Sequence, residues 1–189
     1  MPRRVLPPGV LSKDGRKAFE ATSQESDLAC ALILASYIDQ CLASLLQAFL
    51  IESSITEKLL DPNGGLLGSF EARAQLAYTL ALISKPEYQN LNRIAQIRNL
   101  FAHSHFDIKF EEAAVEKLCN DLILPPIQFH GTDTAQRAKA EESFRSTWLT
   151  TPRMKYVFNS ILLANSIVLT AMGTTRRSRS EQTRTRPAI

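Results

Sequence analysis

The feature that most constrains this fold is one apolar stretch near the N-terminus, LACALILASYIDQCLASLLQAFLI, which spans residues 28–51. Nearly all of its residues suit a helix, and Ser26 and Asp27 just before it are typical N-cap residues. The stretch is long enough to cross a bilayer, but Asp39 would then place an acid in the hydrocarbon. We therefore expect a long central helix of a soluble bundle.

A narrow polar stripe runs along this expected helix at steps of four, four and three residues, formed by Ser36, Gln40, Ser44 and Gln47. The helix is therefore expected to be buried on most sides. Asp39 lies one step off the stripe. It is either solvated at the edge of the stripe or paired inside the bundle with one of two arginines, Arg98 or Arg73.

The rest of the chain also indicates helices joined by loops. Ser69 and Ser84 are placed to cap two consecutive helices, and Thr151 is placed to cap the last one, which Gly173 is expected to end. No alternation typical of a strand occurs along the chain. The sequence therefore predicts an all-α, single-domain helical bundle of five to seven helices over residues 25–173.

The two ends of the chain differ from the body in charge. Residues 1–20 carry five Lys or Arg and two acids, and residues 174–189 carry five Arg and one acid. Because the whole chain has a net charge of +3, residues 21–173 have a net charge of −4. We expect residues 1–24 to be a disordered arm and residues 174–189 a disordered Arg-rich tail, which allows a weak RNA or DNA contact through the tail.

The cysteines argue against a domain stabilised by disulfide bonds and against one stabilised by zinc. Cys30, Cys41 and Cys119 are odd in number and widely spaced, so neither a disulfide framework nor a zinc site is indicated. Three reduced thiols fit a cytoplasmic protein, and the first residues show no apolar leader. We expect no metal and no cofactor.

Asp61 begins the strongest turn signal of the chain, Asp-Pro-Asn-Gly-Gly. Together with Gly68 the glycines could suggest a phosphate-binding loop, but no Gly-Lys-Ser/Thr follows and no strand precedes them. The better interpretation is a turn followed by a tight entry into the next helix.

The stretch QIRNLFAHSH, residues 96–105, places Arg98, Asn99 and two of the three histidines close together. Asn99 and His103 share a helix face, but Arg98 and His103 point about 140° apart on a regular helix. If a looser helix or a second subunit brought them together, the histidine could accept a ribose hydroxyl proton and the arginine could stabilise the phosphate charge. The alternative is a helix C-terminus at which His103 interacts with the last carbonyls.

The run IRNLFAH resembles the Arg-(four residues)-His signature of the HEPN superfamily, many of whose members are dimeric, metal-independent ribonucleases. A longer part of the chain, roughly residues 26–126, resembles the mannitol operon repressor (MltR-like) family. That resemblance rests on an ordered set of positions: Leu59, Leu60, Asp61, Leu67, Gly68, Arg73, Tyr78, Leu80, Arg98 and His103.

The family resemblance implies an all-helical, dimeric, cytoplasmic, repressor-type transcriptional regulator without a recognisable helix-turn-helix. The sequence contains no short helix–Gly turn–helix pair with a basic second helix suited to the major groove. We therefore expect a regulator that forms a homodimer and acts through an unidentified protein partner or weak nucleic-acid binding. The alternative is a HEPN-type ribonuclease that uses Arg98, Asn99 and His103. Arg73 is expected to form a structural salt bridge.

Overall fold

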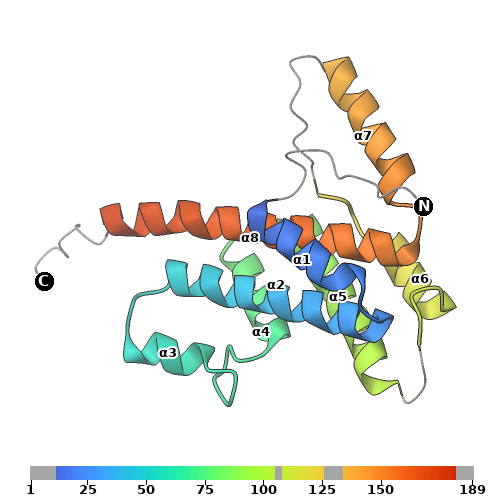
Figure 1. Cartoon of the computed structure of the whole chain (residues 1–189). Coiled ribbons are helices and arrows are strands. Elements are labelled where there is room, and N and C mark those ends of the chain that lie inside the picture. Colours follow the sequence, from blue (N-terminus) through green and yellow to red (C-terminus); the bar gives the residue numbers. More distant parts are fainter. Residues whose placement is uncertain (1–11, 105–107, 126–133, 182–189) are drawn as a thin grey trace, which may run out of the picture.

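The computed structural model describes residues 12–104, 108–125 and 134–181, and these contain eight helices and no strand (Figure 1). The helices are α1 (Lys13–Ser23), α2 (Asp27–Phe49), α3 (Ser54–Leu60), α4 (Phe70–Thr79), α5 (Lys85–His103), α6 (Ala113–Asn120), α7 (Thr134–Trp148) and α8 (Pro152–Glu181). The all-α prediction is confirmed. The predicted number of five to seven helices is wrong, because the described residues contain one helix more.

The additional helix is α1, within the part of the chain that we expected to be a disordered arm. Ser12 caps it by accepting a hydrogen bond from the Gly15 backbone N–H at 3.0 Å. Gly15 and Thr22 are buried, and Phe19 packs against Phe158 of α8 with ring centroids 5.5 Å apart. The helix is thus stabilised by burial against α8, a segment far from it in the sequence.

The core is built around α2 and α8, which share the most extensive interface between any two helices and lie side by side in Figure 1. Leu34, Ile38 and Leu42 of α2 are fully buried, as are Phe158 and Ile161 of α8. Both helices are long and apolar enough to span a membrane, with 44% and 50% of their most apolar windows buried inside the fold. The sequence had suggested a possible membrane span only for the first of them.

The predicted helix starts are confirmed at four positions, and at one of them, Ser84, the backbone N–H donates to the Glu87 carboxylate at 2.6 Å. The hydroxyl groups of Ser26, Ser69 and Thr151 each accept a hydrogen bond from a backbone N–H in the first turn that follows, at 3.2 Å. The predicted end of the last helix is wrong, since α8 continues through Gly173 to Glu181. A glycine inside a helix costs only about 1 kcal/mol relative to alanine, and the residues around it outweigh that cost.

Arg153 connects three parts of the bundle that are far apart in the sequence. Its guanidinium pairs with Asp27 at the start of α2 and donates to the carbonyl groups of Thr22 and Glu25, at 2.8 and 2.6 Å. Asp27 also accepts a hydrogen bond from the Phe110 backbone N–H at 3.2 Å. The N-terminal ends of α2 and α8 are therefore fixed to each other and to the end of α1.

Candidate functional site

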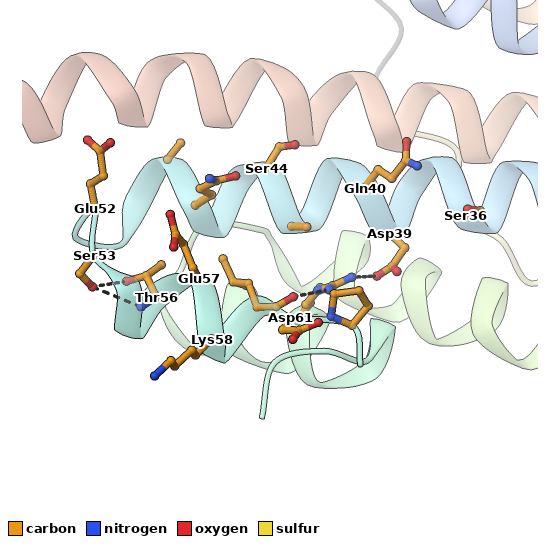
Figure 2. A pocket seen from close by; sticks show the side chains of 16 residues that line it. Ser36, Asp39, Gln40, Ser44, Glu52, Ser53, Thr56, Glu57, Lys58 and Asp61 are labelled. Carbon is orange, nitrogen blue, oxygen red and sulfur yellow. Dashed lines mark hydrogen bonds and ion pairs between the residues drawn. The ribbon is translucent and has the colours of Figure 1, made fainter. Parts of the chain in front are cut away.

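The polar stripe of α2 lies on the wall of a groove of about 1080 Å³, and all four of its residues line that groove. The opposite wall comes from α3, the turn before it and the loop after it (Figure 2). We call this the α2–α3 groove. Its lining residues are Ser36, Asp39, Gln40, Ala43, Ser44, Gln47, Ala48, Glu52, Ser53, Thr56, Glu57, Lys58, Leu60, Asp61, Pro62 and Arg73.

Arg73 of α4 closes one end of the α2–α3 groove, and only 5% of its side chain is exposed. Its guanidinium lies 2.8 Å from the carboxylate of Asp39 on α2. It also donates to the Leu67 carbonyl at 2.8 Å and to the Leu60 carbonyl at 2.9 Å. Of the two arginines considered as partners of Asp39, Arg73 is thus the one in contact. It joins α2, α4 and the loop after α3.

Asp61 and Gly68 shape that loop. The Asp61 carboxylate accepts a hydrogen bond from the Asn63 backbone N–H at 2.9 Å, and the Asp61 carbonyl accepts one from Gly65 at 2.9 Å. A Cβ atom at Gly68 would lie 2.5 Å from the Asp61 carbonyl oxygen, and one at Gly65 would lie 2.3 Å from that of Leu59. The glycines are therefore required by close backbone contacts.

Tyr78 lies outside the α2–α3 groove. Its ring stacks on the ring of Tyr88, with centroids 4.8 Å apart and an angle of 11° between the planes. Because Tyr78 is on α4 and Tyr88 on α5, the pair connects these two helices. The role of Tyr78 in the fold is therefore to pack α4 against α5.

The polar residues of α3 and its preceding turn were missed in the sequence. Thr56 is buried and donates to the Ile51 carbonyl at 2.6 Å, and Ser53 caps α3 by accepting from the Thr56 N–H at 3.2 Å. Glu52, Glu57 and Lys58 add charges to the groove. The stripe on α2 was a visible signal for one wall, whereas nothing local indicated that α3 would fold against it.

Arg98, Asn99 and His103 lie at the end of α5, which stays helical as far as His103. The Arg98 guanidinium donates to the Asn99 side-chain oxygen, at 3.2 Å from Nε and 2.9 Å from Nη2. Asn99 and His103 line a second groove of about 600 Å³, together with Gln96, Leu100, Ser104, Ile108 and Leu118. Arg98 does not line it.

The regular end of α5 has a direct consequence for the ribonuclease hypothesis. Five residues on an α-helix leave Arg98 and His103 about 140° apart, so one chain does not aim both at the same phosphate. The Arg98 side chain is hydrogen-bonded to the side chain of Asn99, whereas His103 lies in the last turn of the helix. His105 and His130 lie outside the described residues.

The three cysteines are free and buried. Burial raises the pKa of the Cys30 and Cys41 thiols to about 11 and that of Cys119 to about 12. Such thiols stay protonated at neutral pH and are poor nucleophiles. Within the described ranges, no group of three or more His, Cys, Asp or Glu is arranged to hold a metal ion.

No protein-family model matches the chain. No curated protein matches it either. Among solved structures, the chain is similar to the X-ray structure of the MtlR–HPr complex from Escherichia coli, with a TM-score of 0.58 and 18% sequence identity. The similarity covers 83% of this chain and 99% of that chain. It shows that the helical fold is shared over nearly the whole length of the solved protein.

Proposed function

We propose that this protein is a repressor-type regulator of the MtlR kind, which resides in the cytoplasm and acts by binding a protein partner. The observation that carries the proposal is the shared fold, which extends over 99% of a chain that was solved together with HPr. The motif positions of the MltR-like resemblance agree with it in structural terms. Asp61, Gly68 and Arg73 build one loop and its anchor, the part of a fold that relatives would need to retain.

We place the partner contact at the α2–α3 groove, the larger of the two grooves described above. Its charged lining consists of four carboxylates and two cations, and one of the cations, Arg73, is already paired with Asp39. The groove thus offers unpaired carboxylates beside the amide and hydroxyl groups of Gln40 and Ser44. Such a surface suits a basic, hydrogen-bonding segment of a partner protein.

Isothermal titration calorimetry of the purified chain with HPr from Escherichia coli tests the proposal, and we expect measurable binding. Ser44→Trp would fill the groove from an exposed position of α2, so we expect it to weaken binding at least tenfold. Ala114→Trp, at an exposed position of α6 away from the groove, is the matched control. Absence of binding by the unaltered chain would contradict the proposal, and equal binding by both variants would contradict the groove assignment.

A homodimer is part of the proposal. Several large apolar side chains of the described residues are strongly exposed in the single chain, including Leu169 (69%) and Met172 (57%) on α8 and Ile51 (73%) before α3. Apolar surface of this kind favours association. Light scattering at micromolar concentration should give twice the 21.1 kDa of one chain. A mass that stays at 21.1 kDa would contradict the dimer.

A further inference from the structure

We infer that α1 and α8 together form a binding site for an amphipathic helix with two aromatic side chains, and that α7 occupies this site as a tethered ligand that can leave it. The inference goes beyond the protein partner proposed above and does not depend on it. It starts from the position of α7, which projects from the bundle in Figure 1. Each of the other seven helices in the described part of the chain shares a more extensive interface with a neighbouring helix than α7 does.

The buried contact of α7 with the bundle is concentrated in its last two turns. Phe144 and Trp148 are the buried ones among the described side chains of this helix, with 3% and 7% exposed. They are spaced i, i+4 and therefore lie on one face of the helix. The ion pair between Glu141 and Arg145, at 2.7 Å, joins two residues of α7 itself. Two aromatic side chains thus provide the apolar anchor of the whole helix.

Phe19 of α1 and Phe158 of α8 form the site that receives this anchor. The ring centroid of Phe158 lies 5.1 Å from that of Phe144 and 5.7 Å from that of Trp148, with angles of 85° and 69° between the planes. The ring of Phe19 lies 6.4 Å from that of Trp148, again edge to face. Edge-to-face pairs are more stable than their buried area alone would give. The site therefore suits two aromatic side chains one helical turn apart.

The site does not depend on α7 for its own position. Phe19 and Phe158 are in contact with each other, with ring centroids 5.5 Å apart. The helix α1 is held on α8 by the hydrogen bond from Ser12 to the Asn165 side chain at 2.6 Å. Another side of α8 packs on α2 in the most extensive interface of the bundle. Removal of α7 would thus leave both walls of the site in place.

The helix α7, by contrast, depends on the site. It has 15 residues, and a helix of that length is marginal in water on its own. Elements with few buried apolar contacts open locally at a lower free energy than the core. Three residues, 149–151, connect α7 with α8, and the last of them, Thr151, caps α8 through its own hydroxyl. The helix α7 can therefore leave the site while α8 stays folded.

The tether makes α7 an intramolecular competitor for any other helix that fits the site. The effective concentration of a tethered segment is on the order of millimolar. The helix α7 therefore occupies the site most of the time if the free α7 segment binds with a Kd below about 1 mM. A partner helix with two aromatic side chains at the same spacing would have to displace it, in the manner of a helix that binds an apolar groove.

The test supplies the α7 segment in trans to the full-length chain. The double variant Phe144→Ala/Trp148→Ala empties the site and removes the only tryptophan of the chain. A synthetic peptide of residues 134–148 then brings the only tryptophan, whose emission shifts to shorter wavelength when the ring is buried. We expect the peptide to bind with a Kd below about 1 mM. A peptide in which alanine replaces both aromatic residues should not bind.

Fluorescence anisotropy of the labelled peptide compares the double variant with the unaltered chain, whose own α7 should weaken binding by about tenfold or more. Lys139→Ala/Glu142→Ala, at exposed positions of α7, is the matched control. It should exclude the peptide as the unaltered chain does. Equal binding by all three chains, or binding by none of them, would overturn the inference.

Hydrogen exchange of the unaltered chain tests the release of α7 without any substitution. Backbone amides in the last two turns of α7 are expected to exchange about tenfold faster or more than those in the middle of α2 and α8. Exchange at the rate of α2 would show that α7 opens only together with the bundle and would contradict the inference. So would loss of the helical circular dichroism in the double variant, because the site would then require α7. HPr binding measured on the same variants reports separately on the proposed function.

Discussion

The guanidinium of Arg73 on α4 lies 2.8 Å from the carboxylate of Asp39 on α2, and this contact fixes one end of the α2–α3 groove. The same guanidinium donates to the carbonyl groups of Leu60 and Leu67. A single buried side chain therefore determines the position of the loop after α3 relative to two helices. The shape of the groove depends on this arginine more than on any residue of its polar stripe.

Arg73→Ala is expected to destabilise the fold by about 3 kcal/mol, because it leaves two carbonyl groups and a half-buried carboxylate without their donor. Urea unfolding followed by circular dichroism measures the change. Lys58→Ala removes an exposed cation of the same groove and should change stability by less than about 0.5 kcal/mol. Equal losses in the two variants would show that Arg73 contributes only its charge.

Gly68→Ala should destabilise the protein by about 2 kcal/mol or more, because the new Cβ atom would lie 2.5 Å from the Asp61 carbonyl oxygen and must displace the backbone. Gly173→Ala is the matched control. No atom lies within 4 Å of a Cβ at that position in α8, so alanine should be neutral or stabilising by up to about 1 kcal/mol. Thermal unfolding of both variants gives the comparison, and a tolerated alanine at Gly68 would contradict the loop geometry.

Total RNA incubated with the purified protein in EDTA is expected to remain intact, since α5 keeps Arg98 and His103 on different faces as far as its end. Arg98→Ala and His103→Ala accompany the unaltered protein in this measurement. Cleavage that persists in the chelator and disappears in both variants would establish the ribonuclease alternative. It would also require that a second subunit complete the site.

Stability is expected to fall as the pH rises above about 9. The thiol pKa is 9.0 before burial and about 11 for Cys41 and 12 for Cys119 in the fold. Between these values the unfolded chain loses protons that the folded chain retains, so the free energy of unfolding decreases with pH, by up to about 1.4 kcal/mol per pH unit for each thiol. Urea midpoints at pH 7 and pH 10 measure the fall, and Cys119→Ala should make it shallower. A midpoint that is unchanged at pH 10 would contradict the burial argument.

The sequence by itself determined the features that depend on neighbouring residues. The apolar run of α2 predicted a long buried helix, and Ser26, Ser69 and Thr151 marked helix starts that the structure confirms. Helical period and N-capping are local, because they involve residues within four positions of one another. The polar stripe of α2 could be predicted for the same reason. That the stripe lines a groove could not be predicted from it.

Only the tertiary structure decided which distant residues meet. It selected Arg73 and not Arg98 as the partner of Asp39, folded α3 against the stripe, and held α1 on α8 although its sequence mixes glycine with charged residues. Such contacts are stabilised by burial between segments that are far apart in the chain, and no pattern within either segment encodes the other.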